Sequence, residues 1–392
     1  MQISRADGSL LARWWFTVDR ALLGSVLVLI GAGVVLSLAA SPAVAVKKGL
    51  APFHFFERHL VYAAIGAAVL IAVSMLTPRS VRRLSLLLFA SALAAMTGVL
   101  LVGDEINGAR RWLRLAGFSL QPSEFAKPAF VVLAAWALAE AGRRREMPAR
   151  SIALALYLAL ATLLVLQPDV GQTLLVSAVW GALFFVSGQS LLAAIGLAGA
   201  GGAGIAAAYL SYPHVRQRID RFLAPVSGDN SQTERAMQSF GEGGFLGRGP
   251  GEGTIKSVLP DAHTDFIFAV VAEEFGIVAC LALLALFGFV VLRALAHAAR
   301  EPDPFLRLAI TGLAAIFGLQ ALINMSVNVG LAPAKGMTLP FISAGGSSTV
   351  AIAITVGLLL ALTRQRADAA RLKMPRFTGT PRQLANVGPR RT

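Results

Sequence analysis

The sequence predicts an all-α integral membrane protein with ten transmembrane helices and a large extracytoplasmic loop between the seventh and eighth helices. Of its 392 residues, 56% are hydrophobic and 14% are charged, whereas charged residues make up roughly a quarter of a typical soluble domain. The chain also contains a series of apolar stretches with the length needed to cross a hydrocarbon core of about 30 Å. These two observations indicate that the bilayer is the solvent of this chain.

The expected spans form one membrane domain, residues 21–363. In chain order they cover residues 21–40, 60–76, 84–102, 125–138, 152–166, 170–186, 191–210, 266–295, 305–329 and 339–362. The fourth and fifth stretches are short, so the count of ten depends most on them. The first stretch lacks a small-residue cleavage site near its end, which predicts a retained span rather than a signal peptide.

Arginine bias predicts the orientation. Arginines gather between expected spans two and three, four and five, and eight and nine, and in the tail 364–392. Because cytoplasmic loops carry an excess of Lys and Arg, we expect both termini, segment 1–20 and the basic tail, in the cytoplasm. The tail is rich in Pro and Arg, which predicts a disordered segment near anionic lipid. The net charge of +14 is spread beside apolar segments, so it does not indicate nucleic-acid binding.

The longest loop, residues 211–262, is extracytoplasmic in this orientation. It is too long for a simple connection, and its acidic and basic residues balance, so we expect short amphipathic helices that lie over the membrane surface. Its glycine-rich stretch, 241–253, lacks the Lys-Ser/Thr ending and the preceding strand of a phosphate loop. ATP binding is therefore not predicted.

Ionisable and amide side chains interrupt two of the apolar stretches. Glu124 and Lys127 are three residues apart, so on a helix they share a face and either form a structural ion pair or bracket a polar cavity. Gln320, Asn324 and Asn328 recur at helical spacing in the ninth span. This stripe predicts either hydrogen bonds between helices or the lining of a substrate groove.

The boundary between the long loop and the eighth span carries His263, Thr264 and Asp265. Asp265 is either an N-cap that satisfies free amides at the helix start, or a partly desolvated carboxylate whose raised pKa suits a general base. Glu273 and Glu274 lie about two turns deeper, where we expect a structural role.

Two further features concern anions and metals. Arg110 and Arg111 lie on the outer side, where short loops usually avoid arginine. They either bind an outer pyrophosphate or carboxylate, or pair with Asp104 and Glu105 or with phospholipid. With one cysteine, Cys280, and no His/carboxylate spacing of metal-ligand type, no metal site is predicted.

Four long motifs occur together in one order. They are NGARRWLRLAGFSLQPSEFAK at 107–127, QPDVGQ at 167–172, GGFLGRGPGEG followed by LPDAHTDFIFAVVAEEFG up to residue 276, and NVGLAPAKGMTLPFISAGGSS at 328–348. With these motifs the chain resembles the SEDS family of polytopic peptidoglycan glycosyltransferases. The segment with Lys335 looks like the division branch, because the elongation branch usually lacks this lysine. Ala344 departs from the family, which commonly has Tyr there.

The resemblance implies a ten-span polymerase of lipid II in the bacterial cytoplasmic (inner) membrane, at the division septum. The family's essential aspartate falls on Asp265. It would take the proton from the 4-hydroxyl of the acceptor sugar as that oxygen attacks the anomeric carbon of the donor chain, with inversion and departure of undecaprenyl pyrophosphate. The substrate-binding candidates are Lys335, Arg110, Arg111, Arg248, His263, Thr264 and Ser347.

The resemblance also implies partners. These are a single-span transpeptidase of the class B penicillin-binding type and division-complex activators. No cofactor is required by the sequence, although a divalent cation, Mg²⁺ or Mn²⁺, could help the basic residues to stabilise the charge of the pyrophosphate. Two other functions stay open: a flippase or transporter for a lipid-linked precursor, indicated by the polar stripe, and a non-catalytic division scaffold, indicated by the basic tail.

Overall fold

The structure is a computed structural model that describes residues 9–106, 109–115, 118–143, 146, 148–188, 191–211, 216, 220, 232–333 and 336–364. The chain divides into two compact units, Met1–Asp19 with Arg364–Thr392, and Arg20–Thr363. In the first unit, α1 (Leu10–Trp15) starts at Ser9, whose side chain accepts a hydrogen bond from the Ala12 amide. Arg364 Nε donates to Thr17 Oγ1 at 3.0 Å, which joins the two segments of this unit. Most of the predicted basic tail lies outside the described residues.

The second unit is helical, which confirms the predicted fold class. Its long helices are α2 (Arg20–Lys47), α3 (His54–Ser74), α4 (Pro78–Val102), α5 (Pro122–Arg143), α6 (Ala149–Leu166), α7 (Val170–Val186), α8 (Leu191–Ser211), α11 (Ile267–Arg300), α12 (Pro304–Asn328) and α13 (Gly346–Thr363). In the part of the chain that was described, eight helices are long and apolar enough to cross a membrane, and α7 is a shorter apolar helix. The count of ten spans stays a prediction.

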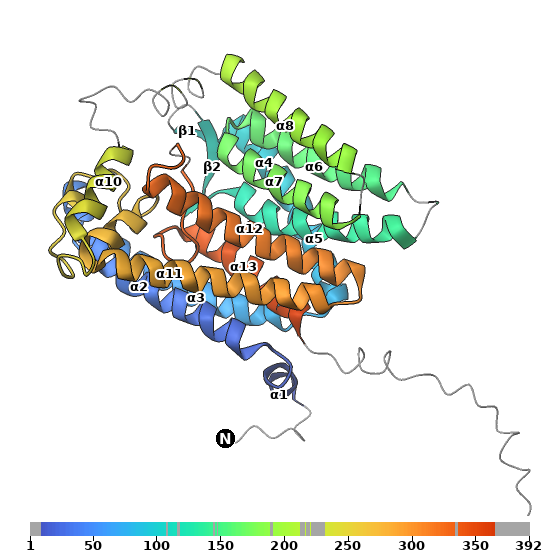
Figure 1. Cartoon of the computed structure of the whole chain (residues 1–392), viewed down its shortest axis with the longest axis horizontal. Coiled ribbons are helices and arrows are strands. Elements are labelled where there is room, and N and C mark those ends of the chain that lie inside the picture. The colour runs from blue at the N-terminus through green and yellow to red at the C-terminus, as the bar shows by residue number, and fades with distance from the viewer. Residues whose placement is uncertain are drawn as a thin grey trace, which may run out of the picture. The chain divides into compact units, whose positions relative to one another are not determined.

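Two helices lie at the centre of this unit. Of an 18-residue apolar stretch in each helix, 72% is buried in α5 and 78% in α13, against 22% in α3 and in α6. A helix that is apolar on all sides belongs in the interior, whereas one buried stripe is enough for a peripheral helix. Helices α4 to α8 lie together in Figure 1, with α2, α3 and α11 on the other side of α12 and α13.

Helices α5 and α6, which correspond to the fourth and fifth expected spans, are longer than the apolar stretches 125–138 and 152–166. Helix α5 begins at Pro122, and therefore takes in the polar residues that precede the apolar stretch 125–138. Proline suits a first helical position, because its fixed φ fits the helix and its missing N–H would have no partner there. The extension brings Glu124 into the same helix as Lys127, and both side chains are buried.

A small antiparallel sheet lies between α4 and α5, and it was not predicted. Its strands are β1 (Asp104–Ile106), β2 (Ala109–Leu115) and β3 (Phe118–Leu120), in the order β1-β2-β3. The sequence Asn-Gly at 107–108 stands between β1 and β2, and this dipeptide favours a two-residue hairpin turn. The sheet places β2 beside α4 and α5, so the outer arginines are held by ordered structure.

The described end of the long loop contains α10 (Gln232–Gly243) and the short helix η1 (Ile255–Ser257). Helix α10 buries Ala236, Ser239 and Gly243 and packs along α11, while most of its other residues are exposed. This confirms the expected amphipathic helix for residues 232–243. Most of the loop from 212 to 231 lies outside the described residues.

Helix α11 is broken at Gly276, which has φ 79° and ψ 178°. The glycine-rich loop completes the hydrogen bonding at this break. The amides of Ile277 and Val278 donate to the carbonyls of Gly244 and Phe245 at 3.0 and 3.2 Å. On the other side, the amides of residues 248 and 249 donate to the carbonyls of residues 273 and 274. Irregular backbone at membrane depth needs such partners from protein, because lipid offers none.

Candidate functional site

A polar cavity of about 530 Å³ lies among α3, β2, α5, α12, the segment before α11 and residues 336–348. A cavity of this volume is large enough for a small-molecule or sugar-sized ligand. It brings together seven of the residues that the sequence singled out: Arg111, Glu124, His263, Thr264, Asp265, Asn324 and Ser347. We therefore treat it as the candidate site.

The backbone of His263, Thr264 and Asp265 is fixed at all three carbonyls. His263 O accepts from the Ala344 amide at 2.9 Å. Thr264 O accepts from Ser343 Oγ at 2.6 Å. Asp265 O accepts from the side-chain amides of Asn324 and Asn328 at 2.9 and 3.0 Å. A side chain on a backbone held in this way is well positioned for chemistry.

The polar stripe of α12 makes hydrogen bonds both to other helices, α5 and α11, and to loop backbone. Asn324 Nδ2 also donates to Met337 O at 2.6 Å, and Gln320 Nε2 donates to Thr338 O at 3.2 Å. Asn328 Oδ1 accepts from the Ala269 amide at 3.0 Å in the first turn of α11. The three side chains tie the segment 263–269 to the segment 337–338, and Asn324 also lines the cavity.

Asp265 does not cap α11. The N-cap residue is Phe266, whose own side chain makes no capping hydrogen bond, and the Ala269 amide of the first turn is bonded by Asn328 instead. The carboxylate is partly exposed at the cavity. Gly336 lies next to this carboxylate, since a Cβ atom added at Gly336 would stand 3.7 Å from Asp265 Oδ2. The backbone at Gly336 thus borders the carboxylate, and both residues line the cavity.

His263 is a neutral neighbour of this carboxylate segment. Burial, with a smaller contribution from the positive charge of Lys48, lowers the pKa of His263 to about 4. Its ring packs on Phe55 with centroids 4.4 Å apart, and its Nδ1 has no partner among the described residues. Near neutral pH the imidazole is uncharged, so it can offer one donor and one acceptor to a ligand.

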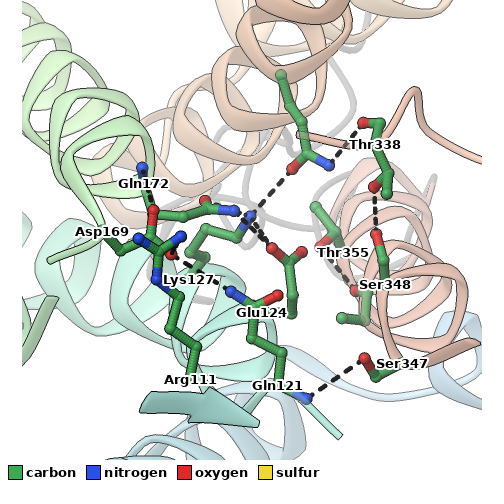
Figure 2. Close-up of polar contacts among 12 residues, drawn as sticks. Arg111, Gln121, Glu124, Lys127, Asp169, Gln172, Thr338, Ser347, Ser348 and Thr355 are labelled. Atoms are coloured by element: carbon green, nitrogen blue, oxygen red, sulfur yellow. Dashed lines mark hydrogen bonds and ion pairs between the residues drawn. The ribbon is translucent and has the colours of Figure 1, made fainter. Parts of the chain in front are cut away.

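Glu124 and Lys127 form a buried ion pair inside a wider network (Figure 2). Lys127 Nζ donates to Glu124 Oε1 at 2.9 Å, to Gln172 Oε1 at 2.8 Å and to Gln320 Oε1 at 3.1 Å. Gln172 Nε2 also donates to Glu124 Oε1, at 2.7 Å. Glu124 lines the cavity, and its Oε2 has no partner among the described residues. The structure therefore shows both arrangements that were considered: an ion pair between Glu124 and Lys127, and a carboxylate at the border of a cavity.

The outer arginines are engaged with protein groups. Arg110 pairs with Glu105 at 3.7 Å, and Arg248 pairs with Glu242; neither lines the cavity. Arg111 lines it, but its guanidinium donates to the carbonyls of Gln167 and Pro168 and lies 3.6 Å from Asp169 Oδ2 (Figure 2). Arg111 therefore joins β2 to the turn between α6 and α7. Their predicted role toward pyrophosphate stays a prediction.

Glu273 and Glu274 hold the glycine-rich loop. Glu273 accepts hydrogen bonds from the amides of Thr254, Ile255 and Lys256 at 2.6, 2.7 and 3.1 Å. Glu274 pairs with Lys256 Nζ and accepts from the amide of residue 251 at 2.9 Å. Both carboxylates are fully buried and away from the cavity, in agreement with the structural role expected for them.

Four cavity residues from α3 were missed: Phe55, Arg58, His59 and Tyr62. Arg58 and His59 precede Tyr62 by four and three residues, so both lie on the side of the helix that carries Tyr62. Polar residues at the outer end of an apolar helix were the only signal in the sequence. Lys335 lies outside the described residues. Within those residues, no three His, Cys, Asp or Glu side chains come together as metal ligands.

The family model for FtsW, RodA and SpoVE, described as "Cell cycle protein", matches residues 20–368. The chain belongs to this family, the SEDS family. The match covers the whole second unit of the structure, including every residue of the candidate site.

Relatives in the SEDS family match over nearly their full length. "Probable peptidoglycan glycosyltransferase FtsW" of Caulobacter vibrioides is 44% identical over 367 residues, 93% of this chain and 94% of the relative. The protein of the same name from Pseudomonas fluorescens is 35% identical over 358 residues, 88% of this chain and 87% of the relative.

Solved SEDS structures share the fold. A chain from "Structural coordination of polymerization and crosslinking by a peptidoglycan synthase complex" matches with a TM-score of 0.72 and 29% identity, covering 88% of this chain and 97% of the other. The rod shape determining protein RodA of Thermus thermophilus matches with a TM-score of 0.63 and 28% identity, covering 89% and 97%.

Proposed function

We propose that this chain is a peptidoglycan glycosyltransferase that polymerises lipid II, with Asp265 as the general base. The observation that carries the proposal is the position of Asp265: its backbone carbonyl is held by two asparagine amides and its carboxylate borders a polar cavity of about 530 Å³. The names of the curated FtsW relatives support the reaction class.

The reaction needs one proton transfer and one displacement. Asp265 accepts the proton of the acceptor sugar's 4-hydroxyl while that oxygen forms a bond to the anomeric carbon of the donor chain. The bond from that carbon to undecaprenyl pyrophosphate breaks, with inversion. Because pyrophosphate is a good leaving group, a single base suffices, provided that positive groups stabilise the departing charge.

The experiment is glycan synthesis from lipid II by purified protein with its transpeptidase partner. We expect Asp265→Asn protein to stay folded in detergent and to lose activity by at least about a hundredfold, since general-base catalysis contributes on this scale. Glu252→Gln, which changes an exposed acid of the outer loop that does not line the cavity, is the matched control for the loss of a negative charge. Normal polymerisation by Asp265→Asn protein would rule out Asp265 as the base.

A flippase remains the second candidate, and its motivation was the polar stripe of α12. In the structure, side-chain amides of the stripe donate hydrogen bonds to the backbone carbonyls of residues 265, 337 and 338. Liposome assays with protected headgroups separate the two activities. Headgroup movement across the bilayer without joined sugars would favour the flippase. Growth of cells that depend on Asp265→Asn protein would favour a division scaffold.

The apolar helices and the FtsW relatives support a multi-pass protein of the inner membrane. We propose further that both termini are cytoplasmic and that the protein works at the septum. In sealed cells lacking the native cysteine, a Glu242→Cys label should be accessible from outside, and a Glu146→Cys label only after permeabilisation. The reverse pattern would invert the topology.

A class B penicillin-binding transpeptidase and division activators complete the proposal. A solved relative comes from a complex that coordinates polymerisation and crosslinking, which supports a transpeptidase partner. Copurification of the full chain with such a transpeptidase tests it. Adding a chelator to the synthesis assay, followed by Mg²⁺ or Mn²⁺, tests whether a divalent cation takes part.

A further inference from the structure

One wall of the cavity is built by α3 and the start of α13. It comprises Arg58, His59 and Tyr62 on α3, and Gly346 and Ser347 on α13, and we call it the α3–α13 wall. Tyr62 packs directly on the helix start, because a Cβ at Gly346 would stand 2.4 Å from its ring. Arg58 and His59 lie one turn from Tyr62 on the same face of α3, and therefore close to the start of α13.

His59 has unmet hydrogen-bonding capacity on this wall. Its side chain is 2% exposed and lines the cavity, yet neither ring nitrogen has a partner among the described residues. Buried polar groups are nearly always hydrogen-bonded, so an orphan of this kind calls for an explanation. A ligand that fills the cavity and accepts a hydrogen bond would provide one.

The start of α13 favours an anion. The helix has 18 residues, and its first amides point out of the helix end with the positive end of the macrodipole. Ser347 Oγ accepts from the Gln121 amide at 3.4 Å, which leaves the hydroxyl proton free to donate (Figure 2). Phosphate groups commonly bind at such helix ends.

Arg58 adds a charge that is not used elsewhere. Arg110, Arg111, Arg114, Arg248, Lys127 and Lys256 each pair with a carboxylate. In the described part of the chain, Arg58 has no acidic partner, and its guanidinium stands 5.9 Å from the centre of the Tyr62 ring. It is thus a cavity cation whose charge remains available to a ligand.

We propose that the α3–α13 wall binds the pyrophosphate of the lipid-linked donor. Arg58 and the helix start supply positive potential, and His59 and Ser347 donate hydrogen bonds to phosphate oxygens. This inference rests on the proposed function, and it moves the pyrophosphate site from the paired outer arginines to α3. As the bond to the anomeric carbon breaks, the charge left on the pyrophosphate would be stabilised at this wall.

The test is equilibrium binding of undecaprenyl pyrophosphate to the full chain in detergent, in Asp265→Asn background so that nothing turns over. We expect Arg58→Gln and His59→Phe each to weaken binding about tenfold, the effect of losing a hydrogen bond to a charged group. His59→Gln, which keeps an N–H donor, should lose less. Arg79→Gln removes an exposed arginine at the far end of α4 and should bind normally.

Melting temperatures in the same detergent show whether each variant is folded. Unchanged binding by folded Arg58→Gln and His59→Phe proteins would overturn the proposal. Equal competition by phosphatidylglycerol would also overturn it, since the wall would then hold phospholipid headgroups. Failure of the Asp265 assay leaves this binding result untouched, so the two proposals fail separately.

Discussion

Gly336 decides how close the backbone comes to the carboxylate of Asp265. Its φ is 63°, a conformation in which a side chain is strained, and a Cβ there would lie 3.7 Å from Asp265 Oδ2. No larger residue can occupy this position without narrowing the space around the proposed base.

We expect Gly336→Ala to lower glycan synthesis by roughly tenfold to a hundredfold, because small displacements at a reacting group have effects of that size. Gly330→Ala is the control, since Gly330 has a similar φ of 73° but faces Met237 rather than Asp265. Steady-state kinetics of both variants makes the comparison. Equal losses in the two would attribute the effect to backbone strain alone.

His263 makes stability depend on pH. Its pKa is lowered from 6.5 to about 4 in the folded protein, so the unfolded chain binds more protons between these values. The stabilisation is complete above pH 6.5 and is lost as the pH falls toward 4. We expect about 2 kcal/mol of unfolding free energy to disappear between pH 7 and pH 5.

The measurement is the melting temperature in detergent at both pH values. His263→Gln protein cannot titrate at this position, so its melting temperature should fall less than that of the unchanged protein. Parallel pH profiles would show that the imidazole is accessible to protons in the folded state.

At the scale of single residues, the sequence predicted the acidic segment and the amide stripe but not how they meet. Asp265 stood out because an acid at a membrane boundary is unusual. Arg58 and His59 did not, since which face of α3 meets the cavity depends on packing against α13, and no local pattern carries that information. The pair between Arg110 and Glu105 was one of the alternatives expected from the sequence, whereas the contacts of Arg111 with the turn between α6 and α7 depend on the sheet, which was not predicted.

The broken helix α11 is the element on which the outer side of the protein depends. At Gly276 a Cβ would stand 2.3 Å from Phe245 O and 2.5 Å from the amide nitrogen of Gly247. Both are backbone atoms that already take part in the loop, so the methyl group cannot be accommodated by rotating a side chain.

We expect Gly276→Ala to detach the glycine-rich loop and to destabilise the protein by more than about 3 kcal/mol, as backbone strain combines with lost buried hydrogen bonds. Gly288→Ala is the matched control on the same helix, where a Cβ would meet nothing within 4 Å. That change should be neutral or slightly stabilising. Thermal unfolding of the two variants distinguishes the outcomes; equal melting temperatures would contradict this account.

Long apolar elements were predicted and short ones were not. The apolar stretches are long, so their helices follow from composition alone. Strands of three residues carry no usable period, and only the Asn-Gly at 107–108 hinted at the hairpin. The break in α11 was also missed, because an isolated glycine in an apolar run is common in membrane helices.

Across the whole molecule, Lys127 links three helices through one ammonium group. It reaches Glu124 on its own helix, Gln172 on α7 and Gln320 on α12. Such a group is costly to remove alone, since its buried partners lose their donor at the same time.

We expect Lys127→Met to lower stability by about 3–5 kcal/mol, because it leaves Glu124 charged and unpaired in the interior. The double variant Lys127→Met with Glu124→Gln should recover part of this loss, since the uncompensated charge is gone. Melting temperatures of both single variants and the double variant complete the cycle. Additive losses would show that the two side chains act independently.

The class of the whole molecule followed from its composition, while its arrangement did not. Apolar content and arginine bias predicted a polytopic protein, and the eight long apolar helices agree. Which helices are central could not be read in the same way. The interior places of α5 and α13 depend on contacts between segments far apart in the chain.

Because of the break at Gly276, hydrogen–deuterium exchange can report on how often the outer loop detaches. The amide protons of Ile277 and Val278 are bonded to the loop instead of to their own helix. These two amides would exchange with deuterium each time the loop detaches, whereas the amides in the next turns of the helix would exchange more slowly, because they need a rarer opening of the helix itself. Uptake at two positions would therefore time the departure of the loop from the bundle.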